Sequence, residues 1–77
     1  LIFNKTPFDI VIKDISEYFH VTFKLPQGKD WSNCTFTSGS LINNTLDEII
    51  TTLKLTYELD CVKVDDQNYK ISKVKCR

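Results

Sequence analysis

The sequence has no alanine, no methionine, only two glycines and two prolines, a single histidine and no surplus of either charge. Ten basic side chains balance ten acidic ones, so the chain lacks the basic excess that nucleic-acid and anionic-membrane binders usually carry. No apolar run approaches the roughly 20 residues that span a bilayer, and no leader-like segment opens the chain. We therefore expect a soluble segment, either mature or cut from a longer protein.

The length sets a second limit. We expect one domain over residues 1–77, because a chain of this size has room for no more. Such a domain buries only about 60% of the surface of its unfolded chain, so nearly every large apolar residue must serve the core. Valine, isoleucine and threonine are abundant, which favours strands and leaves the helices dependent on packing.

The residues that could carry chemistry are few. The three cysteines, at 34, 61 and 76, include no C-x-x-C pair, and His20 is the only other soft metal ligand, so we expect no metal site. Three buried free thiols are the favoured interpretation, and one disulfide with one thiol left over is the alternative. No nucleophile elbow, zinc motif or phosphate loop is present. We expect no catalytic residue, no cofactor and no enzyme activity.

Two amphipathic helices are predicted. Before the first, Thr6 can cap the amides and Pro7 fits the first helical position, while His20 at its end is expected to be a cap residue rather than a catalyst. The second begins with a capping box, Thr45 to Glu48. The predicted buried stripes are Phe8, Val11, Ile12, Ile15, Tyr18 and Phe19 in the first helix, and Leu46, Ile49, Ile50 and Leu53 in the second.

Short strands are predicted around these helices. They are an opening strand at 1–4, alternating segments at 21–25 and 34–37, and a C-terminal hairpin that turns at 65–68. Trp31, in the loop between the second and third strands, is expected to fold back as a lid on the core; an exposed ring would instead mark a contact site. The order β-α-β-β-α-β-β predicts an α+β fold in which two helices pack against small sheets.

The hairpin contains a change of phase. If Val64 pairs with Tyr69 and Val62 with Ile71, the apolar residues nearer the base of the hairpin fall on the other face. A bulge that restores one face is the favoured explanation. The alternative leaves Val62, Val64, Tyr69 and Ile71 as an apolar patch for a partner.

These features resemble a known family. The segment LIFNKTPFDIVIKDISEYFHVTFKL resembles the start of the secretin and TonB short N-terminal domain. The segment CTFTSGSLINNTLDEIITTLKLTYELD is similar to the C-terminal domain of FecR-type anti-sigma factors, with the family pattern at 36–39, 45–50 and 55–57. The chain departs from that pattern in an extended hairpin and in an extra serine, Ser38.

The resemblance implies a role in cell-surface signalling. The chain would be the periplasmic end of a longer, membrane-anchored protein of a Gram-negative bacterium. It would recognise the signalling domain of an outer-membrane TonB-dependent transporter, while a cytoplasmic segment holds a sigma factor. Because exposed strand edges can recruit another strand, we expect the contact near Thr35, Phe36 and Thr37 or on the distal hairpin.

Three other functions are considered. The same fold serves as the signalling domain of TonB-dependent receptors and as the first periplasmic domain of secretins, which sequence context would distinguish. The element order also describes RNA-recognition motifs, but Phe3 and Phe36 are the only aromatic candidates and no basic residue accompanies Phe36. An enzyme is disfavoured by the missing motifs.

Overall fold

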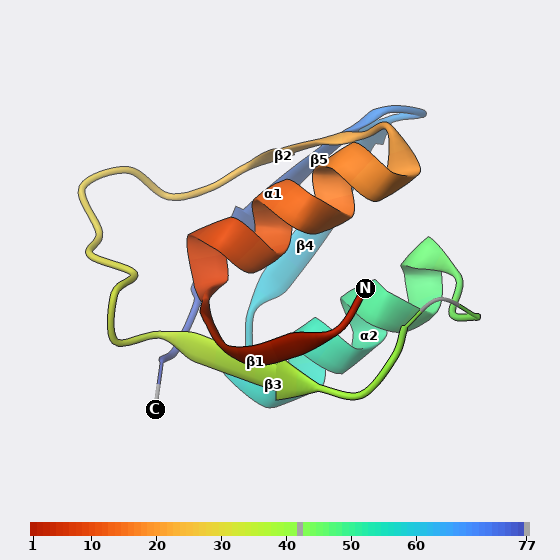
Figure 1. Ribbon diagram of the computed structural model, residues 1–77. Coiled ribbons are helices and arrows are strands. Elements are labelled where there is room, and N and C mark those ends of the chain that lie inside the picture. The colour runs from red at the N-terminus through yellow and green to blue at the C-terminus, as the bar shows by residue number, and fades with distance from the viewer. Residues whose placement is uncertain (42, 77) are drawn as a thin grey trace.

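The described part of the chain forms seven elements in the predicted order, which confirms the α+β class (Figure 1). The computed structural model describes residues 1–41 and 43–76. The elements are β1 (Phe3–Pro7), α1 (Phe8–Phe19), β2 (Thr22–Lys24), β3 (Thr35–Ser38), α2 (Leu46–Tyr57), β4 (Asp60–Asp65) and β5 (Asn68–Ser72).

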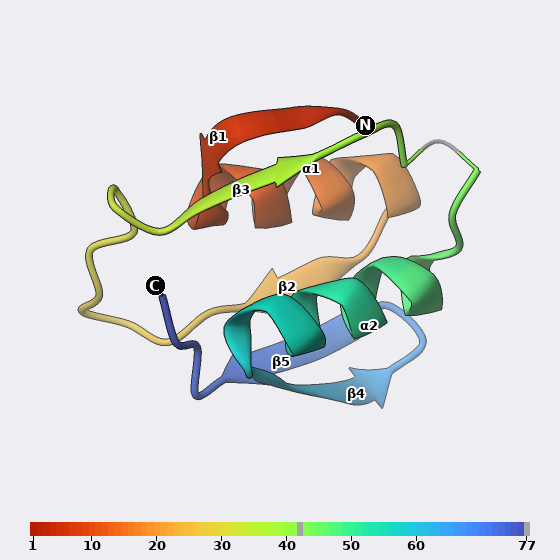
Figure 2. The same cartoon turned by 90° about the horizontal axis from the view of Figure 1, so that it is seen from below.

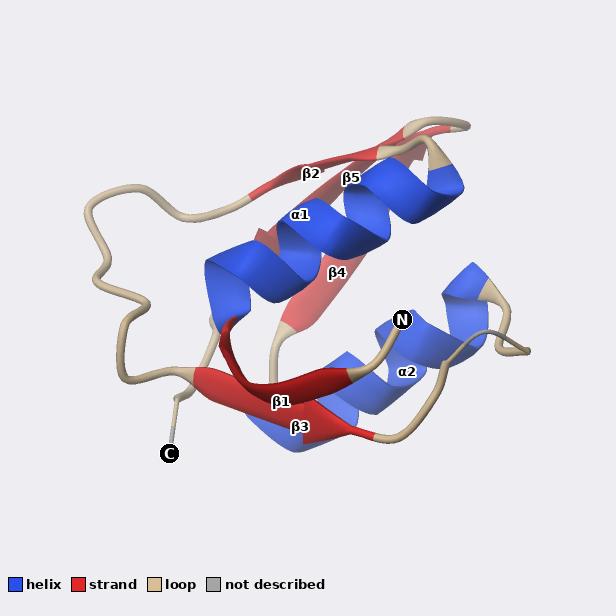
Figure 3. Ribbon diagram, viewed as in Figure 1, coloured by secondary structure: helices blue, strands red, loops and turns tan. Residues whose placement is uncertain are grey.

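The strands form two separate sheets. β1 pairs antiparallel with β3, and a second sheet has the order β2-β5-β4, in which β2 runs parallel to β5 and β4 runs antiparallel to it. Figures 2 and 3 show that the two sheets lie apart, with the helices between them. Each sheet therefore turns one face toward the helices and the other toward solvent.

Helix α1 buries the predicted stripe over most of its length. Phe8, Val11, Ile12 and Ile15 are buried, whereas Tyr18 is 47% exposed because the core ends before the last turn of the helix. His20 is the C-cap, in the left-handed conformation, as predicted.

The predicted N-cap of α1 is wrong. Pro7 holds that position, and the Thr6 hydroxyl accepts a bond from the Asn4 amide instead. The reason is that Thr6 and Pro7 remain in β1, where both pair with β3, so the helix begins one residue later than expected. The Asp9 carboxylate lies in the first turn and accepts a bond from the Ile10 amide.

Helix α2 begins as the sequence predicts. The Thr45 hydroxyl accepts a bond from the Glu48 amide at 3.2 Å, and the Glu48 carboxylate accepts one from the Thr45 amide at 2.9 Å. These bonds lower the pKa of Glu48 below its ordinary value. Ile49, Ile50 and Leu53 are buried, so the capping box and the apolar stripe fix the same orientation.

Aromatic rings join the helices to the two-stranded sheet. The Tyr57 ring, at the end of α2, meets Phe8 of α1 edge-on at 5.0 Å and Phe36 of β3 at 6.1 Å. Phe3 of β1 packs on Phe36 at 5.9 Å. Trp31 lies over Phe8 at 5.2 Å and is half-buried, which confirms its predicted role as a lid on the core.

Core packing predicts a contrast within α1. Ile15 is fully buried, whereas Ile10 on the same helix is 42% exposed. Ile15→Ala should lower the free energy of unfolding by about 2–5 kcal/mol, because it removes buried methyl groups and leaves a cavity. The matched Ile10→Ala should cost less than about 1 kcal/mol. Urea unfolding followed by circular dichroism measures both, and equal losses would contradict the assignment of the buried face.

The expectation of three free thiols is wrong. Cys34, just before β3, forms a disulfide with Cys76 in the C-terminal tail, and Cys61 stays free and half-buried in β4. The fold brings Cys34 and Cys76 together although 42 positions separate them, which no local pattern could reveal. The alternative of one disulfide with one thiol left over is therefore confirmed.

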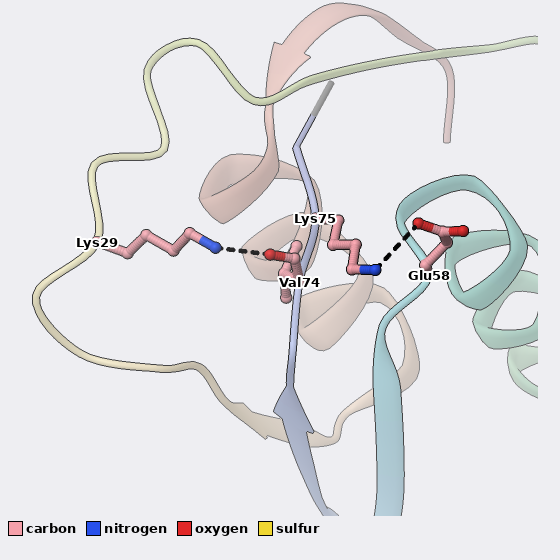
Figure 4. A network of polar contacts seen from close by, with 4 residues as sticks. All are labelled: Lys29, Glu58, Val74 and Lys75. Atoms are coloured by element: carbon pink, nitrogen blue, oxygen red, sulfur yellow. Dashed lines mark hydrogen bonds and ion pairs between the residues drawn. The ribbon is translucent and has the colours of Figure 1, made fainter.

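The same tail is held by polar contacts on both sides (Figure 4). The Lys29 ammonium, from the loop after β2, donates to the Val74 carbonyl at 2.6 Å. The Lys75 amide donates to the Tyr57 carbonyl at 2.9 Å, and its ammonium lies 3.7 Å from Glu58. Val74 is buried, so the tail closes one end of the core and ties the long loop to the end of α2.

Loss of the disulfide should lower the stability of the domain strongly. Cys76→Ser should lower the free energy of unfolding by about 4 kcal/mol, because a loop of this length is no longer closed in the unfolded chain. Cys61→Ala is the matched control and should cost less than about 1 kcal/mol. Chemical unfolding with and without reductant measures both. A wild-type stability that reductant leaves unchanged would contradict the prediction.

Candidate interaction surface

The hairpin pairs in a register that differs from the predicted one. Tyr69 faces Lys63 and Ile71 faces Cys61, whereas Val62 faces Lys70. The register shifts by one residue between Lys63 and Asp65, so a bulge is present at Val64, beside the turn. The prediction that a bulge restores a single apolar face is wrong, because pairing is regular from Asp60 to Lys63, where the apolar pattern changes phase. From Asp60 to Lys63 the observed pairing differs by one residue from the predicted pairing, because the prediction did not include this extra residue beside the turn.

The four-residue apolar patch predicted on the hairpin is therefore wrong. Tyr69 and Ile71 point toward the helices and are 8% and 3% exposed, with the Phe23 ring stacked on Tyr69 at 5.2 Å. Val62 and Val64 are 59% and 64% exposed. The bulge does not bring these valines into the core, and they remain the solvent-facing apolar residues of β4.

The solvent-facing side of the three-stranded sheet forms a continuous surface, which we call the outer face. Alternation along each strand places Val62 there beside Lys70, and the parallel pairing of β2 with β5 places Lys24 on the other side of Lys70. A row across the sheet thus reads lysine, lysine, valine. The outer face comprises Thr22, Lys24, Asp60, Val62, Asn68, Lys70 and Ser72, with Val64 next to it in the bulge.

The second predicted contact, on β3, is partly occupied by the protein itself. Phe36 is buried, so only Thr35 and Thr37 of that triplet present exposed side chains. The Tyr57 hydroxyl donates to the Thr35 carbonyl at 2.6 Å, and the Thr37 hydroxyl accepts from the Lys5 amide at 2.9 Å. A partner strand at this edge would have to replace the bond from Tyr57.

The turn of the hairpin is held by one carboxylate. Asp65 accepts from the Gln67 amide at 2.9 Å and from the Asn68 side-chain amide at 2.8 Å. These bonds, that from Gln67 first, lower the pKa of Asp65 below its ordinary value. The tip of the hairpin is thereby preorganised, and Asp65 uses its charge within the turn.

Nothing in the described residues supports a reaction centre. Residues 1–41 and 43–76 contain no group of three or more histidine, cysteine or acidic side chains that could hold a metal ion. Burial raises the pKa of the Cys61 thiol, with a smaller opposing effect of Lys54, which makes it less reactive than an ordinary thiol. The surface hollows are open, such as the one of about 370 Å³ beside Trp31.

The positions of the aromatic side chains also argue against an RNA-binding sheet. Phe3 and Phe36, the aromatic candidates, are 3% and 6% exposed and pack against each other. The outer face of the three-stranded sheet carries no aromatic side chain on which a base could stack.

Sequence reasoning missed the lysine pair on the outer face. Alternation alone places Lys24 and Lys70 on the exposed sides of their strands. The missing information was that β2 runs alongside β5, since partners 46 positions apart leave no local signal of their pairing. Only the topology places Lys24 and Lys70 at neighbouring register positions.

Tyr57 predicts a dependence of stability on alkaline pH. Burial raises the pKa of its phenol above the ordinary value, so the unfolded chain loses this proton at a lower pH than the folded chain. Its contribution to the free energy of unfolding should be complete below about pH 10 and should fall as pH rises through the folded pKa. Urea unfolding between neutral and strongly alkaline pH should show a shallower decline for Tyr57→Phe than for wild type. Tyr18→Phe, at an exposed tyrosine, is the control, and identical slopes in all three proteins would contradict the prediction.

Comparisons with known proteins agree on the family and the fold. The family model "FecR, C-terminal" matches residues 1–71. A crystal structure of a protein assigned as an anti-sigma factor, from Parabacteroides distasonis, superposes with a TM-score of 0.78 at 17% sequence identity. The match covers 97% of this chain and 34% of that one, so the chain spans about a third of the length of that protein. No curated protein matches the sequence.

Proposed function

Because the chain belongs to the FecR C-terminal family, we propose that it is the protein-recognition domain of a membrane-anchored anti-sigma factor, placed in the periplasm of a Gram-negative bacterium. It receives a signal from the signalling domain of an outer-membrane TonB-dependent transporter. The sigma factor is bound by a cytoplasmic segment of the same protein. The observation that carries this proposal is the family match over residues 1–71.

The disulfide supports the extracytoplasmic location. Disulfides persist in oxidising compartments such as the periplasm and are rare in the bacterial cytosol. The Cys34–Cys76 bond closes one end of the core, so the fold benefits from an oxidising environment. Residues 1–41 and 43–76 include no helix that is long and apolar enough to cross a membrane.

The exposed parts of the sheets support a role in binding protein. Val62 and Val64 expose large apolar side chains on an edge strand, and within residues 1–41 and 43–76 β4 pairs with β5 alone. An unpaired strand edge offers main-chain donors and acceptors to a partner, and the exposed valines offer apolar contact. We propose the distal hairpin as the principal contact. The β3 edge at Thr35 and Thr37 is secondary, because Tyr57 already occupies one of its acceptors.

This function predicts binding that depends on β4. The full-length protein should bind the signalling domain of its cognate transporter, measured by isothermal titration calorimetry. Val62→Glu combined with Val64→Glu should weaken binding about tenfold or more, because charges replace apolar contacts at an interface. Leu55→Glu makes the same change at a residue of α2 that is 78% exposed, and it should leave binding unchanged.

Two results would count against the proposal. Absence of binding by the wild-type protein would overturn the transporter as partner. Retention of full affinity by both the valine variant and a Thr35→Glu, Thr37→Glu variant would overturn both proposed contacts. Circular dichroism of each variant distinguishes lost contact from lost folding.

A further inference from the structure

The outer face carries two lysines at neighbouring register positions. Lys24 of β2 and Lys70 of β5 are register neighbours on parallel strands, which lie about 4.8 Å apart. Like charges in direct cross-strand contact destabilise a sheet. Within residues 1–41 and 43–76, no acidic side chain forms an ion pair with either lysine.

The acidic residues nearest in the sheet are engaged elsewhere. Asp60 lies 3.4 Å from the Lys73 ammonium, and the Asp65 carboxylate accepts bonds within the hairpin turn. The third member of the lysine row is Val62, which is 59% exposed. The outer face therefore combines uncompensated positive charge with an adjacent apolar side chain, although the whole chain carries no net charge.

From this arrangement we infer that the outer face binds a short segment of the transporter's signalling domain that presents carboxylates to Lys24 and Lys70 and an apolar side chain to Val62. This inference rests on the proposed function and specifies the chemistry of the partner. A carboxylate placed between the two ammonium groups would relieve their repulsion, and apolar contact would cover the valine.

The dimensions of the outer face fit a segment rather than a large surface. The three strands have three (β2), six (β4) and five (β5) residues. Together they present a face of roughly 15 by 18 Å. That is well below the about 800 Å² that each partner buries in a standard interface. A strand or loop suits such a face, and two lysines are too few for stable attachment to an anionic membrane, which takes clusters of about four to eight.

The test reverses the charge of the pair. In the full-length protein, Lys24→Glu combined with Lys70→Glu should weaken binding of the cognate signalling domain about tenfold and abolish most of its dependence on salt. Lys24→Arg with Lys70→Arg should retain wild-type affinity. Lys13→Glu, at an exposed lysine of α1, is the matched control and should behave as wild type.

Each outcome decides the inference. If wild type binds and the double reversal binds as tightly as the Lys13→Glu control, the inference fails while the proposed function stands. If wild type does not bind the signalling domain, the proposed function fails and the inference with it. If the lysine pair instead governs binding to vesicles of phosphatidylcholine and phosphatidylglycerol, with no effect on the signalling domain, the protein partner is overturned in favour of a lipid surface.

Discussion

Tyr57 is the residue through which the parts of the domain are connected. Its ring packs against α1 and β3, its hydroxyl donates to the Thr35 carbonyl, and its own carbonyl accepts from the Lys75 amide. One residue at the end of α2 thus contacts the other helix and the two-stranded sheet through its side chain and the C-terminal tail through its main-chain carbonyl. In a domain with so little interior, this connection substitutes for the redundant contacts that a larger core would supply.

Local sequence features predicted the elements that depend on local contacts. The capping box at Thr45 and the stripe through Ile15 require only residues three or four positions apart, and both are as expected. The same reasoning failed at Thr6, which could serve either a cap or a strand. Pairing between β1 and β3, which is not local, decided in favour of the strand.

The candidate surface was harder to predict from the sequence than the fold was. Val62 and Val64 are exposed, and their role in binding a partner stays a prediction, whereas the extra residue beside the turn leaves Tyr69 and Ile71 on the buried side. A one-residue shift moves every side chain of a strand to the opposite face of the sheet. The pairing of a hairpin with a bulge therefore cannot be predicted from alternation alone. Long-range pairings, such as the disulfide and the lysine row, lay beyond any local pattern.

The parallel pairing of β2 with β5 has a consequence for the order in which the protein folds. β2 ends at residue 24, and its partner begins at residue 68. During synthesis or export, β2 cannot pair until β5 has also emerged. A chain delivered from its N-terminus therefore completes this sheet after the pairing of β1 with β3, so the proposed binding surface forms late.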